Sequence, residues 1–226
     1  MDSTINARFI DEYSYFGIRT PEHLASMARL AVQGRVLAFG RPYFNSLDGS
    51  YWDSSLVGSR AGRDVASELL RDVLFEVDDV LADVTDSVSP GDVIEFTIRG
   101  GQVVVTIADT SNADADDHPL PLGTYVIASE PRVDLAIGEP VVLFLDNEKL
   151  DGLYAKQGTK FGYIYRLMPA HDLSYKWSVA DGFAVNESLG IEMSLPELRV
   201  LTASKDFASA VGPSPDETVH PQDPHP

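Results

Sequence analysis

The strongest constraint on this fold is a period of two in the apolar residues of several short segments. In residues 71–81, Val73, Phe75 and Val77 occupy every second position. Successive side chains of a β-strand point to opposite faces, so this spacing predicts a strand with one drier and one wetter side. Residues 141–145 are a continuous apolar run, which is typical of a strand buried on both faces. The pattern therefore predicts a mostly β chain.

Glycine, proline and aspartate mark the turns between further predicted strands. The Ser-Pro-Gly-Asp sequence at 89–92 predicts one turn, and the Asp-Gly pair at 181–182 predicts another. Residues 93–98 and 102–108 flank an Arg-Gly-Gly sequence, which predicts a hairpin whose glycines adopt positive φ. Other strands are expected at 34–39, 163–168, 176–179 and 183–186. Residues 125–129 are expected to form either a short strand or a loop, and residues 42–62 a long excursion.

One short helix is predicted near each end of the chain. Thr20 is suited to the N-cap and Pro21 to the first helical position, with the helix ending near Gly34. A last helix is predicted over about 196–209. The predicted organisation is an arm at residues 1–20 that packs on the body, one domain at 21–210, and a proline-rich, acidic, disordered tail at 211–226.

Composition excludes several kinds of chemistry. The 226 residues include 35 acidic and 17 basic side chains, a net charge of -18, which disfavours nucleic acids and anionic membrane surfaces as partners. Cysteine is absent, so disulfides, thiolate metal centres and a cysteine nucleophile are impossible. No apolar run approaches the ~20 residues that a membrane-spanning helix needs, so a soluble protein is expected. The N-terminal residues as written lack the pattern of a secretory signal, so we expect either a cytoplasmic protein or a mature form whose leader is replaced by Met1.

Several segments carry a resemblance to a known family. They are residues 33–36, 72–81, 91–94 with 100–101, 137–145 and 179–185. Their order resembles a family of bacterial hypothetical proteins, commonly exported, that share a small β-barrel; the similarity covers about residues 30–187. The resemblance implies a single antiparallel, OB-like barrel of five or six strands, closed or partly open, and a location in the cell envelope. The long insertion at about 146–175 departs from the family, which supplies no catalytic residues.

The segment 109–118 is the most concentrated set of possible metal ligands. Its four carboxylates are hard oxygen donors of the kind that Ca²⁺ prefers. The EF-hand pattern fails, because the bend glycine and the closing glutamate are missing. A solvated loop at a hairpin end has the same composition, so a calcium site and a plain loop are both open. The candidate ligands are Asp109, Asp114, Asp116 and Asp117, and no other cofactor is expected.

No motif identifies an enzyme. The sequence has no G-x-S-x-G elbow, phosphate loop, dinucleotide fingerprint or paired-histidine zinc spacing. His171 and Asp172 could form half of an acid–base pair, although an isolated surface histidine is much commoner. A hydrolase that uses a carboxylate pair such as Asp172 with Asp181 is therefore an alternative to a non-catalytic role.

Aromatic residues supply the candidate binding surface. They cluster in the 42–62 excursion and in the insertion, where exposed Tyr and Trp side chains would suit recognition. The other interpretation is that they pack in the core, as large aromatic residues more often do. We expect a non-catalytic β-barrel module that binds a protein or a cell-surface polymer; a structural subunit held by extended termini is the remaining alternative. The candidate residues are Tyr43, Tyr51, Trp52, Tyr154, Tyr175 and Trp177.

Overall fold

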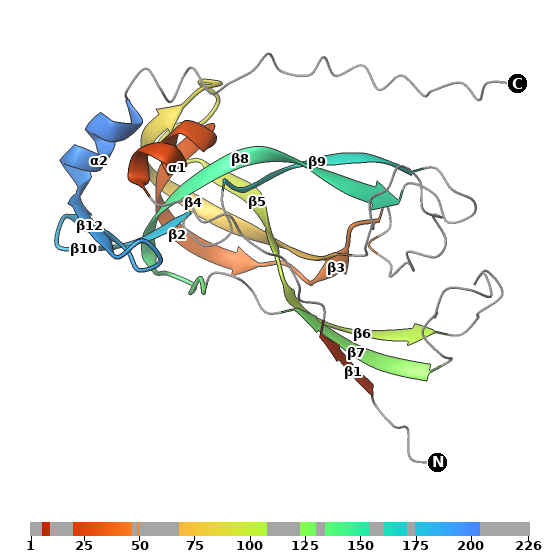
Figure 1. Ribbon diagram of the computed structural model, residues 1–226. Helices are drawn as coiled ribbons and strands as arrows, with labels where there is room; N and C mark the ends of the chain where they lie inside the picture. Colours follow the sequence, from red (N-terminus) through yellow and green to blue (C-terminus); the bar gives the residue numbers. More distant parts are fainter. Residues whose placement is uncertain are drawn as a thin grey trace, which may run out of the picture.

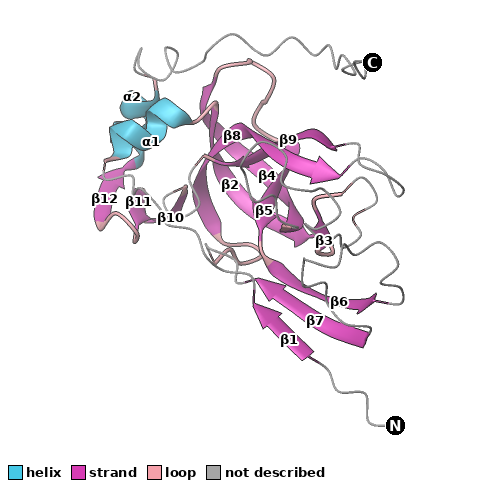
Figure 2. Cartoon of the chain, turned by 45° about the vertical axis from the view of Figure 1, so that its right-hand side comes forward, coloured by secondary structure: helices cyan, strands magenta, loops and turns pink. Residues whose placement is uncertain are grey.

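A computed structural model describes residues 6–9, 20–46, 49, 68–107, 123–129, 134–153, 161–170 and 175–203. Within these residues the fold is mostly β, with two separate sheets and two short helices (Figure 1, Figure 2). The prediction of a mostly β chain with one helix near each end is confirmed. The predicted tail at 211–226 lies outside the described residues.

The main sheet is antiparallel, with the strand order β12-β11-β10-β8-β2-β4-β3; β5 pairs with β4, and β9 pairs with β8. Its strands are β2 (Leu30–Phe39), β3 (Tyr43–Phe44), β4 (Leu69–Asp83), β5 (Val93–Arg99), β8 (Pro140–Leu153), β9 (Phe161–Pro169), β10 (Lys176–Ala180), β11 (Phe183–Asn186) and β12 (Ile191–Ser194).

The two strands with the clearest sequence patterns form the centre of this sheet. On β4, Val73, Phe75 and Val77 are at most 1% exposed, whereas Leu74 and Asp78 on the opposite side are exposed. On β8, residues 141–145 are all 0% exposed and belong to the main core, and β2 pairs with all five while β10 pairs with 141–143. Both predictions are confirmed.

Both helices begin close to the predicted positions, and the first has its predicted cap. Helix α1 (Pro21–Met27) has Thr20 as its N-cap, and the Thr20 side chain accepts a hydrogen bond from the His23 N–H at 3.2 Å. Helix α2 (Leu195–Thr202) begins with a capping box formed by Ser194 and Glu197. The prediction that α1 extends to about Gly34 is wrong, because β2 already begins at Leu30 and pairs there with β4 and β8.

The predicted hairpin across the Arg-Gly-Gly sequence is also wrong. The turn at 89–92 joins β4 to β5 as predicted, but the next strand, β6 (Gly101–Ile107), pairs with β7 (Gly123–Ser129) in the other sheet. Gly100 and Gly101 have φ of 111° and 125° and turn the chain from one sheet into the other. A Cβ on Gly101 would lie only 2.9 Å from Pro42 Cγ, so the crossing is tightly packed.

The small sheet has the strand order β1-β7-β6 and lies beside the main sheet (Figure 2). Part of the predicted N-terminal arm is β1 (Asn6–Phe9), which pairs in parallel with β7. One face of this sheet packs against β3 and the start of β4 in a cluster of Phe44, Leu69, Tyr125 and Ile127, with Val103 and Val105 beside it. This cluster attaches the small sheet to the body.

A closed barrel, one of the two forms that the resemblance implies, is not found among the described strands. The strands are divided between two sheets, and the pairing path of the main sheet does not return to its beginning. Strands β5 and β9 approach each other, but no ladder joins them. The physical reason for the second sheet is the crossing at Gly100 and Gly101, which removes β6 from the main sheet.

Candidate functional site

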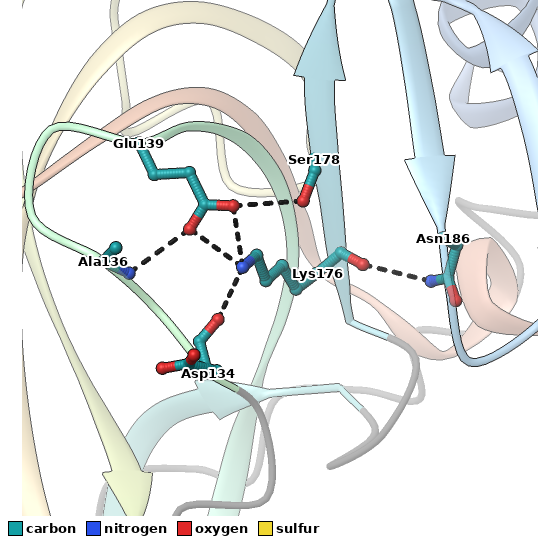
Figure 3. Close-up of polar contacts among 6 residues, drawn as sticks. All are labelled: Asp134, Ala136, Glu139, Lys176, Ser178 and Asn186. Atoms are coloured by element: carbon teal, nitrogen blue, oxygen red, sulfur yellow. Dashed lines mark hydrogen bonds and ion pairs between the residues drawn. The ribbon is translucent and has the colours of Figure 1, made fainter.

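A polar cluster joins the segment before β8 to β10 (Figure 3). The Lys176 ammonium donates to the Glu139 carboxylate at 2.8 Å and to the Asp134 backbone carbonyl at 2.5 Å. The same carboxylate accepts from the Ser178 hydroxyl at 3.1 Å and from the Ala136 N–H at 3.2 Å. Three donor–acceptor contacts therefore hold residues 134–139 against β10, and the fourth, from the Ala136 N–H, lies within that segment.

The environment of this cluster keeps Glu139 ionised. Burial alone would raise the pKa of Glu139, but the hydrogen bonds from Lys176, Ala136 and Ser178 and the charge of Lys176 lower that pKa below 4.5 overall. The Glu139 and Lys176 side chains are 26% and 16% exposed, so their ion pair is partly shielded from water. A carboxylate held in this state is a poor proton donor near neutral pH, since it is already deprotonated.

The geometry assigns this cluster a structural task. A serine nucleophile requires a neighbouring base that can accept its proton, whereas the Ser178 hydroxyl donates to a carboxylate whose pKa is lowered. Beneath the cluster, the fully buried Asn186 donates to the Lys176 carbonyl at 3.2 Å and accepts from the Leu189 N–H at 2.9 Å. The side chains that resemble a reactive group therefore stabilise the chain around β10.

A second polar cluster surrounds Tyr43, one of the predicted binding residues. The Tyr43 hydroxyl of β3 donates to Asp72 of β4 at 2.6 Å, and Thr97 of β5 donates to the same oxygen at 2.8 Å. Arg166 of β9 also forms a hydrogen bond with Tyr43. Burial first, and then the bond to Asp72, raise the pKa of Tyr43 above 10.0. Four strands meet at this half-buried hydroxyl.

The outer face of the small sheet carries no charged side chain among the described residues of β6 and β7. We use "outer face" for the six side chains opposite the packed cluster. Three belong to β6 and are exposed, and three belong to β7 and are half-buried. Val104 is 64% exposed at the centre of the β6 row. None of the six is charged, although 23% of all residues are. The six are Gln102, Val104, Thr106, Thr124, Val126 and Ala128.

Three of the six predicted aromatic binding residues lie in the described part of the chain, and two of these three are buried. Trp177 and Tyr175 are 0% and 2% exposed and belong to the main core, where Trp177 packs against Phe144 with ring centroids 6.1 Å apart. This is the core interpretation that the sequence left open. Tyr43 is half-buried in its polar cluster. Tyr51, Trp52 and Tyr154 lie outside the described residues.

The other candidate groups are not brought together by the described chain. Asp181 lies in the exposed turn between β10 and β11, with φ of 51°, whereas His171 and Asp172 lie outside the described residues. The four candidate calcium ligands also lie outside them, in the connection between β6 and β7. Among the described residues, no group of three or more acidic or histidine side chains could hold a metal ion.

Two features of the site were missed by sequence reasoning. Glu139 and Lys176 are 37 residues apart, and neither belongs to a recognisable motif. The only sequence signal for the outer face is that β6 has no charged residue. That signal is not sufficient without knowledge of the strand with which β6 pairs. The sequence of β6 is Gly-Gln-Val-Val-Val-Thr-Ile. Only the pairing with β7 shows which residues share that face.

Comparisons with known proteins assign no family. No protein-family model, curated protein or solved structure matches the chain. None of the helices in the described part of the chain is long and apolar enough to cross a membrane.

Proposed function

We propose that this chain is a non-catalytic binding module that uses the outer face of the small sheet to bind a protein partner. The observation that carries the proposal is an uncharged, partly exposed sheet face in a chain with a net charge of -18. Val104, 64% exposed, lies at its centre. Charged residues are depleted at the centres of protein interfaces, so a face without charges on a strongly charged chain is a fitting contact surface.

The state of the acidic groups supports a non-catalytic role. The Glu139 carboxylate is occupied by three donors, and Asp72 accepts from Tyr43 and Thr97. Burial alone would raise the pKa of Asp83, but hydrogen bonds from the Thr85 hydroxyl and from backbone N–H groups of the loop that follows lower that pKa below 3.8. Each of these carboxylates holds a loop or a strand junction in place.

The test is a capture experiment from the native source with the intact chain and two lysine variants. Val104→Lys places a charge at the centre of the outer face, where an apolar partner surface would have to desolvate it. The matched control is Val200→Lys on α2, since Val200 is 74% exposed and lies on a different element. Melting temperatures of both variants establish that the fold is intact.

The expected result is one co-purifying protein that is lost with Val104→Lys and retained with Val200→Lys. Equal capture by all three chains would contradict the assignment of the outer face. Specific retention of a polysaccharide instead of a protein would replace the protein partner with a cell-surface polymer, the other partner class that the sequence suggests.

We also propose a partly open barrel as the finer description of the main sheet. Strands β5, β4, β2, β8 and β9 are joined in that order by ladders, and β5 approaches β9 at the remaining gap. The Tyr43 cluster contributes side chains from β3, β4, β5 and β9 around that gap. We further propose that the chain is related to the exported barrel proteins that its sequence resembles, and that it is located in the cell envelope.

A further inference from the structure

Strand β6 is an edge strand of the small sheet, with β7 on one side and no described strand on the other (Figure 2). Among the described residues, every hydrogen bond of positions 102–106 goes to β7. In an antiparallel pair, about half of the N–H and C=O groups of each strand point away from the partner. The open side of β6 therefore presents a row of backbone donors and acceptors that are available to another strand.

The sequence of β6 lacks the features by which proteins normally protect an exposed sheet edge. Such edges are usually very short, or they carry charged residues or proline. Strand β6 has seven residues and neither a charge nor a proline. The other edge strands of the two described sheets follow the rule, because β3 has only two residues and each of the rest carries a charge. Those charges are on Arg8 of β1, Glu95 of β5, Arg166 of β9 and Glu192 of β12.

The packed side of the small sheet holds this open edge in a fixed position. Val103 and Val105 of β6 pack against the cluster that attaches the small sheet to the body. At the start of the strand, the Gly100 N–H donates to the Leu69 carbonyl at 2.8 Å, which fixes the crossing from the main sheet. A strand that is already held in its extended form loses little conformational entropy when another strand pairs with it.

The pairing of β6 with β7 shows which side chains suit a strand beside β6. On the outer face, Val104 lies opposite Val126, and Thr106 lies opposite Thr124, with the two threonine hydroxyls 3.4 Å apart. A strand on the open side meets the same β6 residues, so uncharged, β-branched residues at every second position fit it best. A second copy of this chain fits poorly, because each copy carries a net charge of -18.

We infer that the protein partner binds by adding an extended segment of its own chain as a further strand on the open side of β6. This inference rests on the proposed function and specifies how the partner contacts the small sheet. The added segment forms backbone hydrogen bonds with β6, and its alternate side chains extend the outer face beyond Val104. The backbone ladder supplies affinity, and the uncharged row of side chains supplies selectivity.

The test uses a synthetic peptide as a model of the added segment. The peptide has the sequence of residues 123–129, which the chain itself pairs with β6, and carries lysines at both ends for solubility. The matched control has the same side chains and carries N-methyl groups on its central amides, which block both hydrogen-bonding edges. Amide hydrogen exchange of the intact chain is measured by NMR with each peptide added.

We expect the unmodified peptide to slow exchange at alternate residues of β6, because only every second N–H points away from β7. At a peptide concentration about ten times its dissociation constant, exchange at those residues should slow about tenfold. Residues 73–76 of β4, which are already paired on both sides, should not change. The methylated peptide should leave the exchange of β6 unchanged.

Absence of this alternating protection at the highest soluble peptide concentration, or equal protection by the methylated peptide, would overturn the inference. The same pattern without peptide at rising protein concentration would also overturn it, because a second copy would then be the added strand. If Val104→Lys abolishes capture while the peptide leaves β6 unchanged, the outer face is the contact surface and strand addition is wrong. Capture that Val104→Lys does not affect would instead overturn the proposed function itself.

Discussion

The Glu139–Lys176 pair shows how single residues determine local stability in this chain. Replacing Glu139 with Gln removes the charge that compensates a Lys176 side chain only 16% exposed. We expect Glu139→Gln to lower the free energy of unfolding by about 1–3 kcal/mol, the usual cost of leaving a buried charged group without its partner. Chemical denaturation measures it. Glu192→Gln, at an exposed position on β12, is the control and should change little; an equal loss in both would contradict the assigned role.

The same residue predicts a pH dependence. Because the pKa of Glu139 is lower in the folded chain than its ordinary 4.5, the ionised carboxylate stabilises the fold above that value. This contribution is lost as the pH falls through the folded pKa, below 4.5. We therefore expect the stability difference between the natural chain and Glu139→Gln to shrink below pH 4.5. A difference that stays constant down to about pH 3 would argue against a depressed pKa.

Gly34 lies at a position where a side chain would have no room. A Cβ at this position would lie 1.9 Å from the Glu76 carbonyl oxygen and 2.8 Å from Phe75 Cε1. We expect Gly34→Ala to destabilise the chain by about 3 kcal/mol or more, because the β2 and β4 backbones must separate. Gly40→Ala is the matched control, since its nearest contact is 3.4 Å away. Similar melting temperatures for the two variants would contradict this packing.

At the scale of elements, the turn between β10 and β11 has a backbone conformation that favours glycine. Asp181 and Gly182 have φ of 51° and 82°, and no atom lies within 4 Å of a Cβ built on Gly182. Gly182→Ala should therefore cost about 1 kcal/mol from backbone conformation alone, and Gly182→Asn should cost less because Asn tolerates positive φ. Thermal denaturation of both variants tests this. A neutral alanine substitution would show that the turn adopts another conformation.

Elements were predictable where their signals are local. The alternation on β4, the apolar run on β8 and the capping residue Thr20 all lie within a few residues of what they specify. The choice of partner strand is not local. The Arg-Gly-Gly sequence has the composition of a hairpin loop, yet β5 pairs with β4 and β6 pairs with β7. The surroundings of this crossing come from distant parts of the sequence, with Pro42 close to Gly101 and Tyr125 in the cluster beneath the small sheet.

At the scale of the whole molecule, the fold determines which of the predicted binding residues are buried and which residues are exposed instead. Trp177 and Tyr175 resembled a recognition surface by composition, but they are core residues of the main sheet. Conversely, the outer face consists of ordinary β-forming residues that only the pairing of β6 with β7 brings together. Long-range strand pairing thus determines which aromatic residues are buried in the core. It also determines which uncharged residues share the outer face of the small sheet.

The most direct test of the binding proposal is site-specific photo-crosslinking in the native source. A photoreactive amino acid replaces Val104 on the outer face in one chain and Val200 on α2 in another, both exposed positions. The account predicts a discrete crosslinked protein from position 104 and none from position 200. Identical crosslinking patterns from the two positions, or none at 104 under conditions where the intact chain captures a partner, would contradict it.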